Sequence, residues 1–168
     1  VESLGPVHVL VNNAGTVAPA PLVDTSDEAF DSHYAVNVRT PFVLARAAAA
    51  QMNEGGRIIN IGSIWGQSVP MPGIGAYAMS KFALVGMTRA WARDLAGSGI
   101  TVNCVHPGPI DTDMNPADGP FSGFNTPRTA LGRYGRPEEL ARAVAWLASP
   151  ESSYVTGAEL NVDGGYNA

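Results

Sequence analysis

Four short runs of aliphatic and β-branched residues constrain the fold of this chain more than any other feature. They cover residues 7–13 (VHVLVNN), 57–63 (RIINIGS), 100–106 (ITVNCVH) and 158–164 (AELNVDG). Each run is apolar nearly throughout, which is typical of parallel strands covered on both faces and not of half-exposed strands, whose residues alternate. Because helical patterns separate the runs, the sequence predicts a single α/β domain built on a parallel sheet.

Four helices are expected between and around these strands. One begins after Ser26, which is followed by acidic residues, and a second covers the Ala-rich residues 36–52. A third spans residues 76–96, where apolar residues recur at helical spacing. Pro137 opens the fourth, and two glutamates in its first turn suit the positive end of the helix dipole.

The composition narrows the classes of partner. The 168 residues suffice for one domain, the net charge is −5 and the sequence pI is about 5.0. No basic face is available for a nucleic acid or an anionic membrane surface, so neither is expected as a partner. Cys104 is the single cysteine, which excludes an internal disulfide and indicates a buried thiol. Glycines and prolines interrupt the longest uncharged stretch, 58–80, so we expect no membrane span and a cytoplasmic protein.

One long segment, residues 107–136, carries no strand or helix pattern and is rich in Pro, Gly, Asn and Asp. It follows directly after a predicted strand. Ligands of open α/β sheets bind beyond the carboxyl ends of the strands, so residues 109–135 are expected to form a substrate lid. The alternative is a solvated connection that only tolerates insertion.

Polar and small residues follow the predicted strands. Asn12, Asn13, Ala14 and Gly15 follow the first, Gly62 and Ser63 the second, and Pro107 and Gly108 the third. Since the carboxyl ends of parallel strands lie at one edge of a sheet, these residues should face the same edge. Asn37 is expected near the start of the helix at 36–52, in an irregular turn that exposes its polar groups to this edge.

Tyr77 and Lys81 stand four residues apart in the segment GAYAMSKFAL, residues 75–84. If the segment is helical, the phenol and the ammonium lie on one face of the helix, close to each other. An isolated tyrosine and lysine at this spacing are more often an ordinary packed ring and a lysine whose stem covers apolar surface. A functional interpretation of this pair therefore depends on the other motifs in the sequence.

Six motifs follow one another in a characteristic order: NNAG (12–15), the asparagine of YAVNV, Ser63, YAMSK (77–81), HPGPIDTDM (106–114) and VTGAELNVDGG (155–165). From about Val7 to its end, the chain therefore resembles the classical short-chain dehydrogenase/reductases, and among them the 3-oxoacyl-carrier-protein-reductase-like members. The resemblance implies the C-terminal portion of a Rossmann-like, doubly wound parallel sheet. It also implies NAD or NADP as cofactor, and hydride transfer between a carbonyl compound and a secondary alcohol.

The resemblance assigns catalytic roles to four residues. Tyr77 is implied to be the general acid/base for the reacting oxygen. Lys81 is implied to hold the nicotinamide ribose and, with the cationic nicotinamide, to lower the pKa of the phenol, which is near 10 when free. Ser63 is implied to hydrogen-bond the reacting oxygen, and Asn37 to fix a water in a proton relay to Lys81.

Two further segments are implied to contact the cofactor. Asn12, Ala14 and Gly15 resemble the segment that lines the adenosine side of the cofactor. For Asn12, the alternative role of a cap at the strand end is nearly as good an interpretation. Pro107, Gly108, Ile110 and Thr112 resemble the segment that contacts the carboxamide and phosphates. His106 is expected to be a packed, hydrogen-bonded residue, and Trp65 either lines a substrate pocket or packs under a loop.

The sequence departs from the family in one respect: it contains no T-G-x-x-x-G-x-G turn, which in complete members seats the pyrophosphate at a helix N-terminus. We therefore expect the chain to carry the catalytic half of an enzyme, with the Gly-rich βαβαβ half and the NAD/NADP determinant outside it. The alternative is a truncated, non-catalytic partner-binding or oligomerising domain. The intact set of Ser63, Tyr77 and Lys81 favours the enzyme.

The expected partners are a small carbonyl or alcohol substrate and further copies of the chain. The sequence leaves sterols, sugars, acyl thioesters and simple ketones open as substrates. By resemblance, the helices at 36–52 and 76–96 should form a homodimer or homotetramer. The residues that suit such contacts are small or apolar: Ala45, Ala48, Ala49, Phe42, Met87 and Trp91.

Overall fold

A four-stranded parallel sheet lies at the centre of the molecule, in the order β1 (Val9–Asn12), β2 (Arg57–Ile61), β3 (Thr101–Pro107), β4 (Glu159–Val162). The protein is represented by a computed structural model that describes residues 5–168. All three strand pairings are parallel, so the predicted α/β class and the Rossmann-like arrangement are confirmed. The predicted domain, 1–168, includes residues 1–4, which lie outside the described residues.

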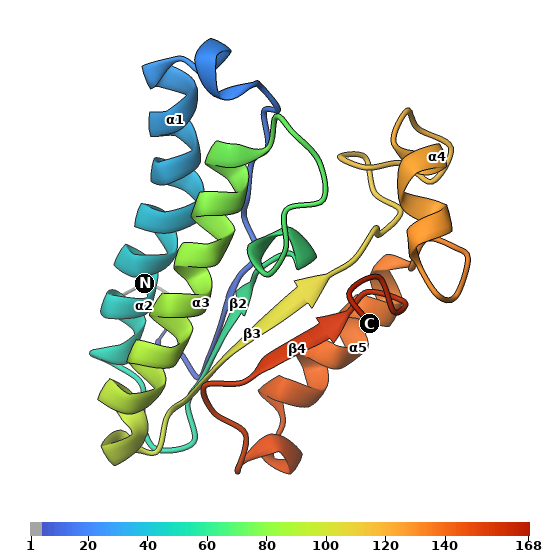
Figure 1. Ribbon diagram of the computed structural model, residues 1–168. Helices are drawn as coiled ribbons and strands as arrows, with labels where there is room; N and C mark the ends of the chain where they lie inside the picture. The colour runs from blue at the N-terminus through green and yellow to red at the C-terminus, as the bar shows by residue number, and fades with distance from the viewer. Residues whose placement is uncertain (1–4) are drawn as a thin grey trace.

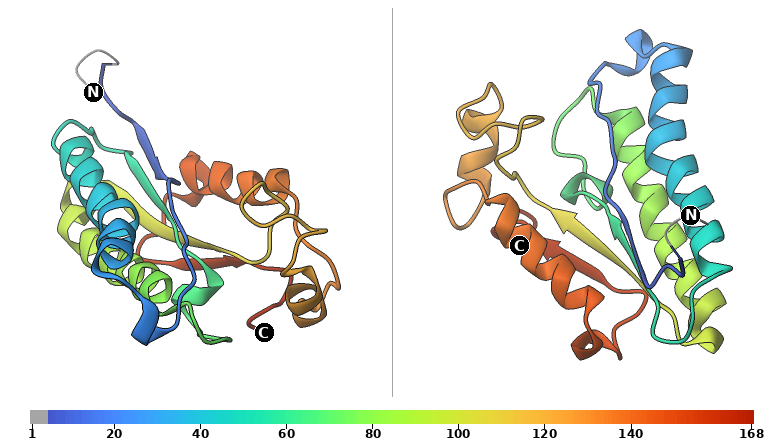
Figure 2. Two further views of the ribbon diagram at one scale, coloured as in Figure 1. Left: turned by 90° about the horizontal axis from the view of Figure 1, so that it is seen from above. Right: turned by 180° about the vertical axis from the view of Figure 1, so that it is seen from behind.

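Helices cover both faces of the sheet. Figure 2 shows α1 (Asp27–Tyr34), α2 (Thr40–Ala49) and α3 (Gly75–Leu95) on one face, and α5 (Pro137–Ala148) on the other. Strand residues alternate between these layers: Ile58 packs with α2 and α3, and its neighbour Ile59 packs with α5. Every residue of β2 is buried, which explains why this run is apolar without alternation.

The first strand is the least covered part of the sheet. Within the described residues β1 pairs on one side only, with β2. Its Val9 and Val11 are 40% and 39% exposed, so the strand presents an apolar edge with unpaired backbone groups.

The helix predicted to start at residue 36 does not start there. The chain is helical without a break from Asp27 to Ala49, and residues Ala35–Arg39 form a π-turn that joins α1 to α2 (Figure 1). Ser26 caps the start, where its Oγ accepts a hydrogen bond from the amide of Ala29 at 3.2 Å. Asn37 therefore lies in the middle of a long helix, although in an irregular turn as expected.

The segment after β3 is more ordered than its sequence indicates. It contains the short helix α4 (Ser122–Asn125), and its two ends meet at a bridge between Ile110 and Gly135. The amide of Asp111 donates to Gly135 O at 2.9 Å, and the amide of Gly135 donates to Pro109 O at 2.9 Å. The segment thus leaves the sheet and returns to the same point.

Short 3-10 turns complete the fold, at Leu22–Asp24, Ile64–Gly66, Ala96–Ser98, Thr126–Arg128 and Pro150–Ser152. None of the helices described has both the length and the apolar character needed to cross a lipid bilayer. Among the same residues, no group of three or more His, Cys, Asp or Glu side chains is arranged to hold a metal ion.

Candidate active site

The carboxyl ends of the first three strands open into one large cleft. Asn13 and Gly15 follow β1, Ser63 follows β2, Pro107 is the last residue of β3, and Gly108 follows it. All five residues line the cleft. Its volume is about 940 Å³, near the upper end of the range for ligand sites. Of the eight residues predicted to face one edge, these five and Gly62 line the cleft, and Asn12 and Ala14 do not.

The start of α3 adds Tyr77 and Lys81 to the same side of the cleft, and we call these two residues, with the five above, the sheet wall. Lys81 Nζ lies 5.7 Å from the centre of the Tyr77 ring and donates a hydrogen bond to Ile61 O at 2.9 Å. Gly66 permits this placement, because a Cβ there would lie 2.9 Å from the backbone carbonyl of Lys81.

Burial dominates the ionisation of both groups. It raises the pKa of Tyr77 above its usual value, and the contact with the Ser63 hydroxyl opposes this rise. It lowers the pKa of Lys81 to about 8, since a charged amine is costly away from water. The family resemblance predicts that Lys81 and the nicotinamide together lower the pKa of Tyr77; in the protein without a cofactor, burial raises this pKa instead.

Ser63 is fixed by its neighbours. Its Oγ accepts a hydrogen bond from the amide of Trp65 at 3.1 Å, which leaves the hydroxyl proton free to donate. His106 Nδ1 lies 2.7 Å from Ser63 O, and its Nε2 lies 3.2 Å from a carboxylate oxygen of Glu159. His106 is fully buried, and burial lowers its pKa, so it is the packed, hydrogen-bonded residue that the sequence indicates.

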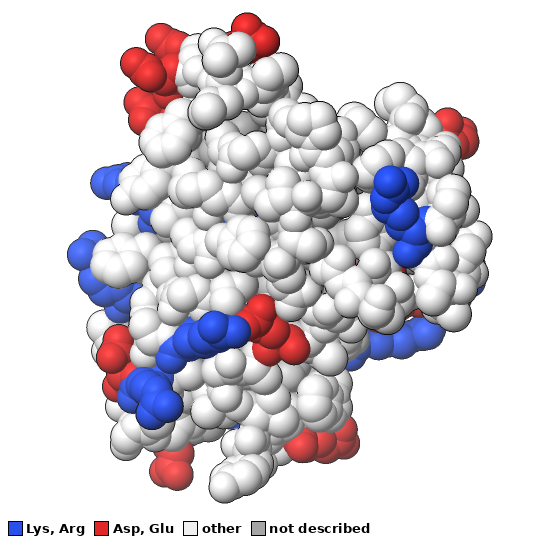
Figure 3. Space-filling model, in the orientation of Figure 1, with Lys and Arg blue, Asp and Glu red and all other residues white. Residues whose placement is uncertain are grey.

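The cleft carries almost no charge. Among the described residues that line it there is no Asp, Glu, Arg or His, and Lys81 is the one charged side chain. Figure 3 shows this on one face of the molecule, where charged side chains lie mainly towards the margins and the area between α3 and α4 is largely uncharged.

Comparison with known proteins identifies the family. A family model described as "Enoyl-(Acyl carrier protein) reductase" matches residues 1–167. The "Cyclic-di-GMP-binding biofilm dispersal mediator protein" of Escherichia coli (strain K12) is 46% identical over 168 residues, which are 100% of this chain and 71% of that protein. The chain belongs to the classical short-chain dehydrogenase/reductases.

Solved structures of this family superpose closely on the chain. A dehydrogenase/reductase from Sinorhizobium meliloti 1021 is 53% identical, with a TM-score of 0.97 over 100% of this chain and 67% of that one. A blue fluorescent protein from a metagenomic library, in complex with NADPH, is also 53% identical, with a TM-score of 0.98 over 99% of this chain and 68% of that one. The family is one of NAD(P)-dependent oxidoreductases.

Asn37, which the family resemblance places in a proton relay, has its side chain fully engaged. Its Oδ1 accepts from the amide of Thr16 at 2.9 Å. Its Nδ2 donates to Thr16 O and to Ser80 Oγ, both at 2.9 Å. The side chain, which is fully buried, ties the loop after β1 to α3. A role of Asn37 in the relay stays a prediction.

The two remaining residues of the NNAG motif do not line the cleft. Asn12 is buried, and its Nδ2 donates to Asn60 Oδ1 at 2.8 Å. Asn60 donates in turn to Thr88 Oγ1 on α3 at 2.9 Å, so Asn12 links the sheet to a helix. Ala14 is exposed beside Gly15, which does line the cleft. Contact of Asn12 and Ala14 with a cofactor stays a prediction.

The predicted lid supplies the other side of the cleft. Ile110 and Thr112 line it, and so do Met114, Asn115 and Phe121 farther along the segment. Phe124, another aromatic residue of this segment, instead stacks with the guanidinium of Arg128, 3.6 Å from the ring centre. Several apolar side chains of the segment thus line the cleft, and its role as a substrate lid stays a prediction.

His33 is a residue of the site that sequence reasoning missed. It is buried on α1 with its ring edge-on to that of Tyr77, at a centre distance of 6.5 Å and an angle of 74°. Its Nε2 accepts from the amide of Ala18 at 3.1 Å, so Nδ1 carries the proton that it shares with Ala29 O at 2.7 Å. The signal was weak, since one histidine on a polar helix suggests only a surface residue.

Proposed function

We propose that this protein reduces a carbonyl compound to a secondary alcohol, and catalyses the reverse oxidation, with NAD(P) as the hydride carrier and Tyr77 as general acid/base. The observation that carries the proposal is the convergence of Ser63, Tyr77 and Lys81 on one side of a nearly uncharged cleft at the carboxyl edge of the sheet. A purely structural role would not require these three residues. Burying a hydroxyl, a phenol and an amine in one cavity costs free energy that apolar side chains would not cost.

The residues of the cleft fit the nicotinamide end of the cofactor. A Cβ at Gly15 would lie 3.5 Å from Lys81 Nζ and 3.6 Å from Asn37 Oδ1, so the absence of a side chain leaves room beside the amine. Ser63 and Lys81 supply donors, and Pro107 and Gly108 provide an uncharged surface for a planar ring. When bound, the cofactor supplies the hydride.

The proton chemistry belongs to the protein. The raised pKa of Tyr77 keeps its phenol protonated at neutral pH, which suits donation to a carbonyl oxygen. The free hydroxyl proton of Ser63 can hydrogen-bond the same oxygen. A pKa of about 8 allows Lys81 to give up and regain a proton near neutral pH, and so to help restore the phenol.

A single substitution tests the role of Tyr77. Residues 1–168 would be joined to the Gly-rich βαβαβ half of a complete family member, and we call this protein the joined enzyme. Tyr77→Phe should lower kcat by about 10²- to 10⁴-fold with the fold retained, because the proton donor is removed. Tyr154→Phe, which changes a fully exposed phenol, is the matched control and should leave kcat unchanged. Activity of Tyr77→Phe within a few-fold of the parent would overturn the assignment.

Cofactor affinity of residues 1–168 by themselves should be weak. The sequence has no Gly-rich turn to place a pyrophosphate at a helix N-terminus, and the nicotinamide side alone offers one cation. Calorimetric titration with NADPH would measure this directly. Micromolar affinity would show that the phosphate site lies within these residues.

The molecule bound in the substrate position is not fixed by the relatives. The protein from Escherichia coli carries the name of a cyclic-di-GMP-binding protein, whereas the family model is described as an acyl-carrier-protein reductase. These names refer to different ligands. The substrate must therefore be inferred from the cleft of this chain.

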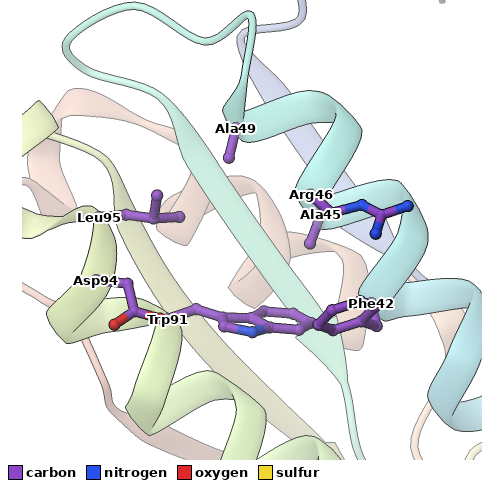
Figure 4. A pocket seen from close by; sticks show the side chains of 7 residues that line it. All are labelled: Phe42, Ala45, Arg46, Ala49, Trp91, Asp94 and Leu95. Atoms are coloured by element: carbon purple, nitrogen blue, oxygen red, sulfur yellow. The ribbon is translucent and has the colours of Figure 1, made fainter.

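A second proposal concerns assembly: the chain forms a dimer or tetramer through α2 and α3. Figure 4 shows a groove of about 240 Å³ between these helices, where the Phe42 and Trp91 rings lie 6.2 Å apart. Phe42 is 44% exposed, which is costly for an aromatic side chain in water. Three alanines are predicted to suit a partner helix. Ala45 and Ala48 are buried in the core of the chain itself. Ala49 lines the groove, as does Ala45.

Light scattering tests this proposal. The joined enzyme should be a dimer or tetramer at micromolar concentration. Phe42→Glu should shift it towards the monomer, because the added carboxylate would be buried without a partner. Tyr154→Glu, at a fully exposed position, should not change the mass. A monomeric parent protein would contradict the proposal.

A further inference from the structure

One part of the cleft is lined by large apolar side chains, although the lid sequence is mostly polar and small. Trp65 and Met71 come from the segment after β2, and Met114 and Phe121 come from the lid. We call these four residues the apolar wall. Nothing in the hydride-transfer chemistry requires them, so their chemistry describes the body of the substrate.

The apolar wall begins beside the reacting groups. The indole ring of Trp65 lies edge-on to the Tyr77 ring, at a centre distance of 6.1 Å and an angle of 89°. The amide of Trp65 is held by Ser63 Oγ at 3.1 Å. A carbonyl oxygen placed between Ser63 and Tyr77 would thus lie close to the indole.

The lid side of the apolar wall is held in a defined shape. Asn125, which is buried, donates from Nδ2 to the Tyr134 hydroxyl at 3.0 Å. That hydroxyl donates in turn to Asn115 Oδ1 at 3.2 Å. These bonds connect the segments that carry Met114 and Phe121, so the backbone that presents the two side chains is held in place without a substrate.

A charged substrate would find no partner in this cleft. Among the described residues that line it, Lys81 is the one charged group; its Nζ donates to Ile61 O at 2.9 Å, and the proposed function assigns its other donors to the cofactor. Figure 3 likewise shows a mainly uncharged surface between α3 and α4. Moving a carboxylate or phosphate from water to such a surface costs several kcal/mol. Apolar surface gains about 25 cal/mol per Å² on the same transfer.

We propose that the substrate is an uncharged ketone or secondary alcohol with a compact hydrocarbon body, such as an alicyclic ketone, recognised by Trp65, Met71, Met114 and Phe121. This inference rests on the proposed function, because it places the reacting carbonyl at Ser63 and Tyr77. It excludes substrates that carry a carboxylate or phosphate near the carbonyl group.

A matched pair of ketones tests the proposal in the joined enzyme. Cyclohexanone should be reduced with a kcat/KM at least about 10²-fold above that of the same ring bearing a carboxylate, since the charge must be buried unpaired. Phe121→Ala should raise KM for cyclohexanone about 10-fold with little change in kcat, because it removes binding surface and no reacting group. Equal or better use of the carboxylated ketone would overturn the proposal.

A charge introduced into the apolar wall should reverse the preference. Met114→Lys places an ammonium at the cleft and should improve kcat/KM for the carboxylated ketone about 10-fold while weakening that for cyclohexanone. Leu131→Lys adds the same charge to the lid at a position that is 66% exposed and outside the cleft, and it should change neither value. The same response to both substitutions would mean that long-range charge, not the apolar wall, selects the substrate.

Binding measured without turnover separates this proposal from the proposed function. Ligand-observed NMR on the joined enzyme with its cofactor should show cyclohexanone bound and its carboxylated analogue free. Selective binding of cyclohexanone with no turnover would support the apolar wall and contradict the proposed reaction. Absence of binding by either ketone would overturn the apolar wall.

Discussion

The sheet wall and the lid face each other across the cleft, and they are held in place by different interactions. The sheet wall follows strand ends fixed by the parallel ladder, and Lys81 donates to the backbone of β2. The lid is closed at its base by the bridge between Ile110 and Gly135 and shaped by side-chain hydrogen bonds through Tyr134. The proposed reacting groups thus lie on the side held by the strand ladder, and the proposed substrate-selecting side chains lie on the side held by side-chain hydrogen bonds.

The largest expected effect concerns the sheet wall, where burial should change the ionisation of Lys81. Lys81 is the only lysine in the sequence, so carbon-13 labelling of lysine in residues 1–168 gives one assignable signal. We expect it to titrate near pH 8 and not at the ordinary value of 10.5, because burial lowers the pKa. The Lys81→Arg variant should lack the signal. A midpoint above pH 10 would mean that the amine is solvated and that the sheet wall is more open than described.

The same shift predicts how stability depends on pH. Between pH 8 and 10.5 the unfolded chain holds the Lys81 proton and the folded chain does not, so this group's contribution to stability rises with pH across that window. The full change corresponds to roughly 3 kcal/mol. Since Cys104, whose pKa burial raises to about 12, acts in the opposite direction, the effect should be taken as the difference between the parent and Lys81→Met.

A second prediction tests how closely the sheet wall is packed. Gly66→Ala should destabilise the protein by about 1–3 kcal/mol, because its Cβ would overlap the backbone of Lys81. It should also lower activity by displacing the amine. Gly86→Ala, in the same helix as Lys81 but with open space at its Cβ position, should instead stabilise by about 0.5–1 kcal/mol. Urea unfolding of both variants measures the difference, and a like effect at the two sites would contradict the described packing.

The smallest expected effect on stability concerns the lid. Tyr134→Phe removes the hydroxyl between Asn125 and Asn115 and should cost about 1 kcal/mol, since the buried Asn125 amide loses its acceptor. We expect a KM raised several-fold and a kcat close to the parent value. Tyr166→Phe is the matched control, because among the described residues its buried hydroxyl has no hydrogen-bond partner. A large loss of kcat in Tyr134→Phe would show that the lid also positions the reacting groups.

The sequence by itself determined the layers of the fold and the relative placement of Tyr77 and Lys81. Residues 57–63 and 100–106 are apolar nearly throughout because their strands are covered on both faces, and this pattern is readable without the structure. The four-residue spacing of Tyr77 and Lys81 fixes their relation, because one helical turn separates them whatever surrounds the helix. Both features depend on local backbone geometry.

Only the tertiary structure decided what depends on contacts between distant segments. The side chain of Asn37 is consumed by Thr16 and Ser80, which lie 21 and 43 residues away, and no local pattern indicates this. The pKa of Tyr77 depends on how deeply its ring is buried. The composition of the apolar wall depends on which lid side chains point into the cleft. The lid is polar by composition, because composition counts all its residues equally. The cleft is lined only by those residues that the closed loop directs towards it.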